Sequence, residues 1–433
     1  MLHIKPNNKN ADNMYSLLKE LFPIHRCLVG PGFSKSINVL KKYSKLDILK
    51  FKSGTKLFDW EIPKAFKVNE VFIEDSKGNR YLNFKKNHYY VRPHTLSFFG
   101  KMSKTELKKK IKTHSKLKKA IPLRPLYYKK DWGLSASQLE VDNLPEDIYK
   151  VNIDVENIDS NLEIGIAKIK GKSKKTILVS SYLCHPHGAN DNLSGVVVTM
   201  ELLKLLRKFK NLEYSYIFAI WPETIGAIAF IHKYMKKLKD IVGGFSCMIV
   251  GDKSPFFYKK SIFGDSLIDR SFSHALKYSK EKYKVVNYFS EGSCERQFNS
   301  PGIRKPYGLI SRGFTRFSEY HTSLDNLDLV NKKNLLETLK VCCSTIEVLE
   351  RNFCYRPNYT CEPFMTKYGI YPHDLGAGDG EAINRSALAY YDLINFTDEK
   401  VDLLEIAEKL NIPIKNFDRA ITDFKKVGLI KKI

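Results

Sequence analysis

The sequence contains no Cys-x-x-Cys pair and no apolar run long enough to cross a membrane. Its eight cysteines follow no regular spacing, which excludes a zinc finger built on such pairs and a dense disulfide framework. A membrane-spanning helix needs about 20 apolar residues, and the segment 1–22 also lacks the apolar stretch of a signal peptide. We therefore expect a cytoplasmic protein with reduced cysteines and no membrane contact.

Acidic residues are also scarce, since 72 Lys and Arg stand against 47 Asp and Glu and give a formal net charge of +25. A nucleic-acid or other polyanion site would account for such an excess. The lysines are, however, spread along a chain rich in Asn, Ile, Tyr and Phe, a composition that AT-rich codons produce. Both readings stay open, and the composition favours a solvated basic surface.

Apolar residues are plentiful, and their pattern divides the chain. Hydrophobic residues make up 43% of the 433 positions, enough for one large core with a smaller unit attached. Changes in periodicity indicate N-terminal helices of the core (1–50), an inserted β-rich domain (51–105), the main α/β core (106–375) and a C-terminal unit (385–433).

The C-terminal unit reads as two amphipathic helices around a turn, followed by a short strand-like end. This order is typical of a winged helix, and the glycine-rich run "GAGDGE" before it reads as a linker. Winged helices bind DNA through one helix, and Lys415 and Arg419 would supply positive charge there. Because Asp418 and Asp423 share that helix, we expect a protein contact or dimerisation, hence a homo-oligomer, before DNA binding.

Three apolar runs of the main core each end at a side chain that can bind metal. "TILVSSYLC" leads into His185, "YSYIFAIWP" into Glu223, and "FSCMIVG" into Asp252. These runs alternate with amphipathic helices, which predicts a mostly parallel or mixed sheet covered by helices. Since ligands bind at the carboxyl edge of such sheets, we expect the three side chains to lie close together.

Two further residues complete a set that suits zinc. Asp191 lies near the start of the helix "VVVTMELLKLL", and His321 lies in "SEYHTSLDN". Hydrolytic zinc sites use His and carboxylate ligands and leave one position open, and two-metal sites share a carboxylate. Asp325, four residues after His321, would orient that imidazole. The candidate ligands are therefore His185, Asp191, Glu223, Asp252 and His321.

These stretches together resemble a known family. "HPHGANDNLSG", "WPETIGA", "IVGD", "GSCERQF" and "EYHTSLD" are similar to motifs of the zinc-dependent aminopeptidase family, which also contains the glutaminyl cyclases. "SGTKLFDWEIP", "YYKKDWGLS" and the C-terminal tail resemble one bacterial branch, often found among polysaccharide-biosynthesis genes. The resemblance implies a zinc-exopeptidase-like α/β fold, a mixed sheet sandwiched by helices, with an inserted β-rich domain and a C-terminal winged helix.

The resemblance also implies roles for individual residues. His185 and Asp252 would bind one zinc ion, Glu223 and His321 a second, and Asp191 would bridge them, so that one or two Zn²⁺ are expected. A zinc-bound water would then attack the amide of a small peptide or an aminoacylated metabolite. The side chains that would contact the substrate are Arg296, Gln297 and Tyr320.

Two positions depart from the family pattern. Aminopeptidases of this kind carry Glu-Glu where this chain has Pro222-Glu223, and the first Glu is their general base. Either Glu223 serves as the base and the second metal is lost, or Glu295 or Glu319 replaces it. Cys294 stands where the family commonly has Asp.

Three hypotheses about function follow from these observations. The first is a zinc-dependent aminopeptidase-like hydrolase. The second is a catalytically weak metal-binding protein whose winged helix docks a partner or DNA. The third is a transcription regulator that senses a ligand in a former peptidase pocket.

Overall fold

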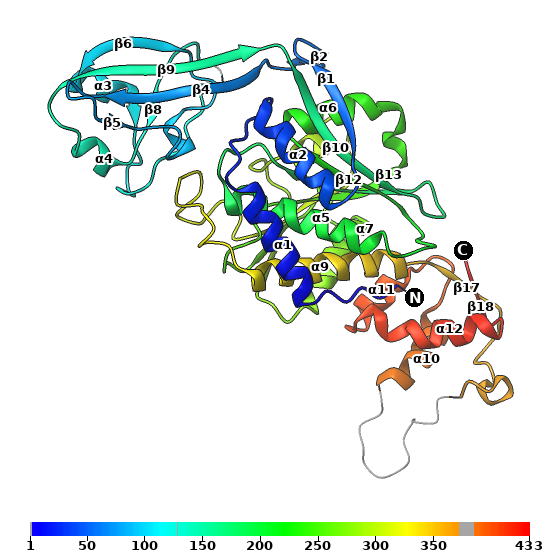
Figure 1. Ribbon diagram of the computed structural model, residues 1–433. Coiled ribbons are helices and arrows are strands. Elements are labelled where there is room, and N and C mark those ends of the chain that lie inside the picture. The colour runs from blue at the N-terminus through cyan, green and yellow to red at the C-terminus, as the bar shows by residue number, and fades with distance from the viewer. Residues whose placement is uncertain (1, 128, 372–384) are drawn as a thin grey trace. The chain divides into compact units, whose positions relative to one another are not determined.

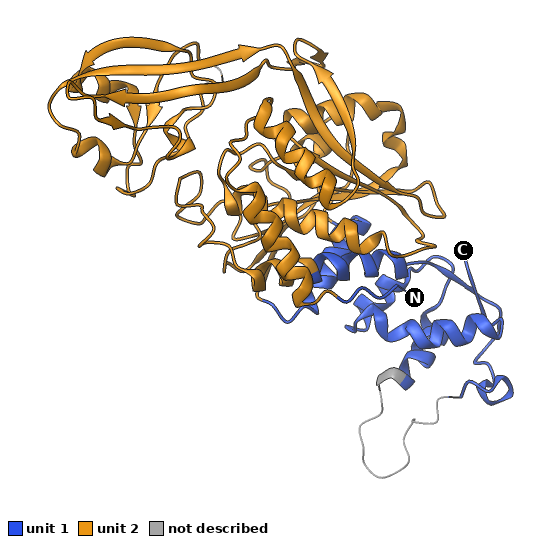
Figure 2. Ribbon diagram, viewed as in Figure 1, with its two compact units in different colours: residues 1–5, 265–281, 340–433 blue, residues 6–264, 282–339 orange. Residues whose placement is uncertain are grey.

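The computed structural model describes residues 2–127, 129–371 and 385–433, which form two compact units. Figure 1 labels the helices and strands, and Figure 2 colours the two units. The larger unit comprises Pro6–Gly264 and Lys282–Leu339. The smaller unit comprises Met1–Lys5, Asp265–Glu281 and Lys340–Ile433.

An eight-stranded mixed sheet forms the centre of the larger unit, in the order β1-β10-β12-β11-β13-β16-β14-β15. Strands β12, β11, β13 and β16 are parallel neighbours, whereas β10 and β14 pair with them antiparallel. This arrangement confirms the predicted fold class. The strands are β1 (Asp47–Lys52), β10 (Asn161–Ile169), β11 (Thr176–Tyr182), β12 (Ser215–Trp221), β13 (Ile241–Cys247), β14 (Phe256–Lys259), β15 (Tyr283–Val286) and β16 (Tyr307–Arg312).

The order of the parallel strands creates a switch point beside β11. Helix α5 (Gly195–Leu206) connects β11 to β12, and α6 (Ile225–Tyr234) connects β12 to β13. Because β12 and β13 lie on opposite sides of β11, right-handed crossovers put α5 and α6 on opposite faces of the sheet (Figure 1). A crevice at the carboxyl end of β11 follows from this reversal.

The N-terminal helices cover part of this sheet, as the sequence predicts. Helix α1 buries Met14, Leu17, Leu18 and Leu21 at helical spacing. It contacts α5, and α2 contacts β10. The bounds of the two N-terminal helices are α1 (Asn8–Leu21) and α2 (Pro31–Tyr43), and other helical segments of the larger unit are η2 (Ala189–Ser194), η3 (Met235–Asp240) and α8 (Glu295–Asn299).

A second, four-stranded sheet in the order β5-β4-β9-β6 forms a β-rich lobe, residues 65–158. Strand β4 pairs antiparallel with β9, which follows it by more than 70 residues along the chain. The lobe therefore extends beyond the boundary expected at residue 105, because the strand that completes its sheet comes later. Its elements are β4 (Ala65–Glu74), β5 (Arg80–Tyr81), η1 (His88–Tyr90), β6 (Phe98–Ser103), α3 (Lys104–Lys110), β7 (Ile111–Lys112), β8 (Leu134–Ser135), α4 (Gln138–Asp142) and β9 (Ile148–Ile158), and the hairpin β2 (Lys56–Leu57) and β3 (Trp60–Glu61) precedes it.

The smaller unit contains the predicted winged helix. Strand β17 (Tyr355–Pro357) pairs antiparallel with β18 (Ile430–Lys432), so this module begins well before residue 385. The run "GAGDGE" lies outside the described residues. No helix in the described parts of the chain is long and apolar enough to cross a membrane. Helix α9 (Lys332–Arg351) begins in the larger unit and ends in the smaller one. The other elements of the smaller unit are α7 (Leu267–Lys277), η4 (Met365–Tyr368), α10 (Arg385–Phe396), α11 (Leu403–Lys409), η5 (Ile414–Phe417) and α12 (Asp418–Lys426).

Candidate metal centre

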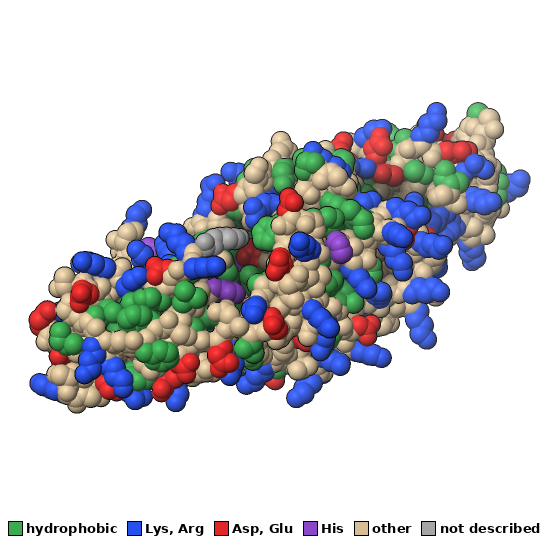
Figure 3. Space-filling view, turned by 90° about the horizontal axis from the view of Figure 1, so that it is seen from above, with side chains coloured by type: hydrophobic (Ala, Val, Ile, Leu, Met, Phe, Trp, Pro, Cys, Tyr) green, Lys and Arg blue, Asp and Glu red, His purple; other side chains and the backbone are tan. Residues whose placement is uncertain are grey.

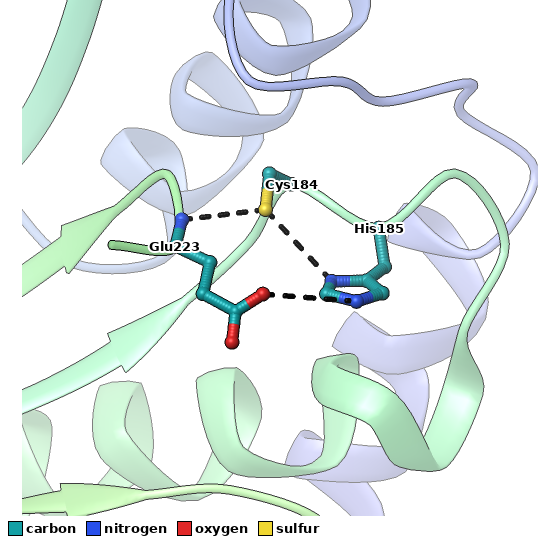
Figure 4. A group of neighbouring side chains, drawn as sticks. All are labelled: Cys184, His185 and Glu223. Atoms are coloured by element: carbon teal, nitrogen blue, oxygen red, sulfur yellow. Dashed lines mark hydrogen bonds and ion pairs between the residues drawn. The ribbon is translucent and has the colours of Figure 1, made fainter. Parts of the chain in front are cut away.

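Two of the three predicted strand ends meet at the switch point. Cys184 and His185 follow the end of β11, and Glu223 follows the end of β12. Figure 4 shows the three side chains facing one another across the carboxyl edge of the sheet. Their ligand atoms all lie within 4.8 Å of one another. Cys184 was not singled out from the sequence, although it directly precedes His185.

A second group shares His185 and contains the ligands that the sequence predicts most directly. The Nε2 atoms of His185 and His321 lie 3.3 Å apart. Oδ2 of Asp191 lies 3.6 Å from the first and 3.2 Å from the second. Ligand atoms about 2.0–2.1 Å from a tetrahedral zinc ion stand about 3.3–3.4 Å apart. We call His185, Asp191 and His321 the triad, and its spacing fits one zinc ion.

The carboxylate of Asp191 is buried and only half satisfied by the protein. Tyr182 donates its hydroxyl to Oδ1 at 2.5 Å, whereas Oδ2 receives no hydrogen bond from the described residues. Burial alone would raise the pKa of Asp191, but the charges of His185 and His321 lower it to about 2. A buried, negatively charged oxygen that faces two imidazoles has the position and the charge that a zinc ligand requires.

Asp325 holds the loop that carries Asp191. It accepts hydrogen bonds from the backbone N–H groups of Asn190 at 2.6 Å and Asp191 at 2.8 Å. Burial and the neighbouring charge of Asp191 raise the pKa of Asp325 to about 8, against the lowering effect of these hydrogen bonds. The sequence predicted that Asp325 would orient the His321 ring, but its carboxylate instead accepts hydrogen bonds from backbone groups. Its effect on the site is to fix the Asp191 loop.

The ring of Tyr320 positions His321. The two rings stack with centroids 3.9 Å apart and an interplanar angle of 18°. Tyr320 was predicted to contact substrate, which stays a prediction, and in the structure its ring packs against the imidazole. His321 itself has a positive φ of 55°, which is unusual for a residue with a side chain.

Asp252 belongs to neither group of ligand atoms. It is 3% exposed, accepts a hydrogen bond from Asn190 Nδ2 at 2.6 Å, and accepts another from the backbone N–H of Ser254 at 2.6 Å. Asp252 follows the end of β13 by five residues, whereas His185 and Glu223 follow their strands by three and two, so the strand end does not carry it to the triad. The structure therefore does not bring it into the ligand set predicted from the sequence.

Glu223 is the accessible carboxylate of the site. Its side chain is 29% exposed, and Oε2 lies 4.0 Å from His185 Nε2. Ser293 donates its hydroxyl to Oε1 at 2.7 Å. The backbone N–H of Glu223 is bound to Cys184 Sγ at 3.3 Å. One carboxylate oxygen is thus held by Ser293, while the other faces the triad.

Glu295, the other predicted catalytic acid, is fully buried in a different environment. Its Oε1 lies 2.5 Å from Nζ of Lys259, and both side chains have no exposed surface. The backbone N–H of Ser293 also donates to this carboxylate. Glu295 does not line the cavity beside the triad, so its observed partners are structural.

The two departures from the family pattern lie close to Glu223. Cys294 is buried, and its Sγ accepts a hydrogen bond from the backbone N–H of Thr224 at 3.4 Å. Burial and the neighbouring charge of Glu223 raise the pKa of the Cys294 thiol to about 12. Pro222 accepts a hydrogen bond from Gly226 at the start of α6. Neither side chain supplies an acid to the site.

A cavity of about 780 Å³ lies beside the triad. His185, Glu223 and His321 line it, and so do Arg296 and Gln297, the two remaining residues predicted to contact substrate. The volume is within the usual range for a small-molecule site, about 300–1,000 Å³.

Comparison with known proteins agrees with this architecture. One relative, from Clostridium acetobutylicum, is provisionally named a polysaccharide biosynthesis protein with an aminopeptidase-like domain. It is 36% identical over 432 residues, which cover 100% of this chain and 99% of that protein. A crystal structure described provisionally as a peptidase from Clostridium acetobutylicum has a TM-score of 0.92 and 35% identity, covering 98% of this chain and 97% of that chain.

Two further solved structures share the fold at low identity. The zinc aminopeptidase BSAP from Bacillus subtilis has a TM-score of 0.56 and 17% identity, covering 80% of this chain and 95% of that chain. A peptidase M28 precursor from Shewanella amazonensis has a TM-score of 0.57 and 11% identity, covering 82% and 97%. At these identities the likeness shows the fold alone.

Two family descriptions cover almost the whole chain. Residues 353–432 match the family described as winged helix-turn-helix, in agreement with the position of β17. Residues 15–352 match the family described as a domain of unknown function, DUF4910. The chain therefore belongs to the DUF4910 family and joins an aminopeptidase-like fold to a C-terminal winged helix.

Proposed function

We propose that this protein is a zinc-dependent hydrolase that cleaves an amide bond in a small peptide or an aminoacylated sugar or metabolite. The observation that carries the proposal is the triad, whose three ligand atoms are spaced 3.2–3.6 Å apart at the edge of an open cavity. The name of the Clostridium acetobutylicum relative, which refers to polysaccharide biosynthesis, favours an aminoacylated sugar among these substrates.

One ion is the better match to the ligand spacing. The two imidazole Nε2 atoms are 3.3 Å apart, which is the edge of a single tetrahedral site, whereas ions in two-metal sites stand about 3.5–4 Å apart with separate imidazoles. Zinc bound there would supply a Lewis acid that polarises the substrate carbonyl and activates water.

The protein's own residues supply the remaining chemistry. Glu223 is the base that we propose, since its Oε2 faces the triad while Ser293 holds Oε1. It would take a proton from the attacking water and return it to the leaving amine. Glu295 is tied to Lys259 and would not serve in this role. Arg296 and Gln297 would contact the substrate from the cavity wall.

The test combines metal analysis with an activity screen. Full-length protein loaded with zinc is compared with His185→Ala in a panel of aminoacyl reporters and aminoacylated sugars. The proposal expects about one zinc per chain and hydrolysis of some member, both lost in the variant. Zinc that stays bound in His185→Ala would contradict the metal site.

A catalytically weak metal-binding protein is the second candidate, and Pro222 favours it. This residue replaces the acid that serves as base in the related aminopeptidases, and the neighbouring Cys294 has a thiol that burial keeps protonated. Stoichiometric zinc without hydrolysis of any substrate would favour this candidate over the first.

For the winged helix we infer a protein contact or dimerisation rather than DNA binding. On helix α12, Asp418 binds Arg351 and Asp423 accepts a hydrogen bond from Tyr390, so acidic groups stand among its lysines and would repel phosphates. Duplex binding that weakens steeply with salt would contradict this inference, whereas a concentration-dependent dimer would support it.

A further inference from the structure

The cavity beside the triad has walls from several distant parts of the chain. His185 and His321 line it on the side of the main sheet, while Arg92 and Arg124 of the β-rich lobe line another part. Figure 3 shows Lys and Arg side chains spread over a whole face of the protein. Positive charge at the surface therefore does not identify a binding site by itself. The hydrogen-bond and ion-pair partners of individual side chains are needed to do so.

Positive charge dominates the lining of this cavity. Only two carboxylates, Glu61 and Glu223, occur among its described lining residues, and Glu223 belongs to the metal centre. The four arginines that line it are Arg26, Arg92, Arg124 and Arg296. None of the four forms an ion pair with a carboxylate of the described residues, although many other arginines of the chain do.

Arg26 is the most unusual of the four, because it is 1% exposed. Its Nε donates to the backbone oxygen of His185 at 3.0 Å, and its Nη1 donates to Leu21 and Ile24. Nη2 is buried and has no hydrogen-bond partner among the described residues. Burial lowers the pKa of Arg26 to about 10, so the side chain stays charged at neutral pH. A buried guanidinium without a counter-ion is costly, which points to a partner that the chain does not supply.

In the described parts of the chain, the other three cavity arginines also donate only to backbone oxygens, and they are less buried than Arg26. Arg92 donates Nε to the backbone oxygen of Arg124 at 2.8 Å, and Arg124 donates Nη1 to the backbone oxygen of Leu123 at 3.4 Å. Arg296 donates Nε to the backbone oxygen of Ser293 at 3.2 Å. Each bond uses one N–H of a guanidinium that has five. Most donors of these arginines are thus left for another acceptor.

We propose that these arginines bind a carboxylate or phosphate group of the substrate, so that the amide presented to the triad belongs to an anionic molecule. Guanidinium groups bind both kinds of anion through paired N–H donors. The identity of the reaction rests on the proposed function, whereas anion binding in this cavity does not.

The first experiment measures a preference rather than activity alone. Zinc-loaded full-length protein is assayed with two aminoacyl substrates that differ only in a carboxylate against its neutral amide, and with a third that carries a phosphate monoester. Wild type should show a kcat/KM about tenfold or more higher for a charged substrate than for the neutral one. Equal values for all three would overturn the proposal.

The variants locate the preference in the cavity. Arg26→Met would risk misfolding because Arg26 holds three backbone oxygens, so the test uses the double variant Arg92→Met and Arg124→Met. The charged-to-neutral ratio should fall toward one, mainly through KM. The matched control is Arg80→Met, in the same lobe, whose side chain is paired with Glu70 and Glu74. An unchanged ratio in the double variant would also overturn the proposal.

A binding arm separates this proposal from the hydrolase itself. The metal is removed with a chelator and the chelator is dialysed away, so that an anion cannot bind through zinc. Inorganic phosphate and glutarate are then titrated by calorimetry at matched ionic strength. Binding that is lost in the double variant supports the anion site even if no substrate is hydrolysed. Hydrolysis without charge preference and without anion binding overturns the anion site and leaves the hydrolase standing.

Discussion

Among the described residues, arginine side chains are paired with carboxylates in the smaller unit, whereas those that line the cavity of the larger unit are not. In the smaller unit, Arg270 donates to both oxygens of Asp402 at 2.8 and 2.9 Å and reaches Glu408 at 2.8 Å. Arg351 similarly binds Asp418 at 2.9 Å. In the cavity, Arg26 has an unpartnered Nη2, and no ion pair joins it to a described carboxylate.

The carboxylates differ in the same way. Asp402 and Asp418 are held by arginines, whereas Oδ2 of Asp191 receives no hydrogen bond from the described residues. Paired charges in the smaller unit stabilise its own fold. The unpaired guanidinium of Arg26 is a cost to the folded chain that a ligand would offset, and the carboxylate of Asp191 faces two imidazoles in a site that a metal would fill. Their removal should thus change binding more than stability.

The largest expected effect is the loss of metal from Asp191→Asn. This change keeps the shape of the side chain but removes the negative charge between His185 and His321, so zinc affinity should fall by more than about 100-fold. Metal content after dialysis and competition with a chromophoric chelator measure it. Asp252→Asn is the matched control, since Asp252 lies outside both ligand groups, and it should keep its metal. Equal zinc in both variants would contradict the triad.

The next largest effect concerns an ion pair of the smaller unit. Arg351→Met leaves the carboxylate of Asp418 without its guanidinium, and the Arg351 side chain is only 4% exposed. The smaller unit should lose about 2–3 kcal/mol of unfolding free energy in denaturant titrations, with metal binding unchanged. Arg356→Met is the control, because its pair with Glu399 is half exposed and should contribute less than about 1 kcal/mol. Similar losses from both variants would show that burial does not set the difference.

The sequence alone predicted some parts of the fold and the site correctly and others wrongly. Apolar runs predicted β11 and β12, and their ends placed His185 and Glu223 correctly because side chains just after parallel strands share one edge of the sheet. The same reasoning was wrong for Asp252, because it lies five residues after the end of β13. The lobe boundary failed because β9 pairs with β4 across a long stretch of chain, and local patterns carry no information on such pairing.

The sequence predicted Arg296 as a substrate contact, whereas the other three arginines of the cavity could not be found from it. Arg92 and Arg124 each precede a proline in separate segments, and only the folded lobe brings them together. The same Arg-Pro step at Arg356 leads to an ordinary pair with Glu399. A local motif thus does not separate an arginine that binds a ligand from one that holds the fold, whereas its partners in three dimensions do.

A smaller effect concerns pH and the histidines behind the cavity. Burial, together with the charge of Arg26, lowers the pKa of His88 to about 4, and burial lowers that of His25 as well. The unfolded chain then binds more protons than the folded chain between pH 6.5 and about 4. Stability is full above pH 6.5 and should fall by up to about 3 kcal/mol as the pH drops through this window.

The variant His88→Phe isolates this contribution. His88 packs against Phe84 and His187, so a phenyl ring keeps the packing and removes the titrating group. Unfolding free energies measured from pH 7 to pH 4 should show a shallower slope than wild type. His274 in the smaller unit has a pKa lowered by burial too, so the variant keeps part of the wild-type slope. Parallel curves for wild type and His88→Phe would refute the assignment.

The smallest expected effect compares the thiols of the two regions. Burial raises the pKa of Cys294 to about 12 and also raises that of Cys184, so neither forms a thiolate near pH 8. Cys361 in the smaller unit is exposed. Brief treatment with iodoacetamide should therefore label Cys361 and leave Cys184 and Cys294 unmodified in peptide mass spectrometry, with no change in zinc content. Rapid labelling of Cys294 in the folded protein would show a reactive thiol beside Glu223. It would contradict the prediction that burial keeps this thiol protonated and unreactive.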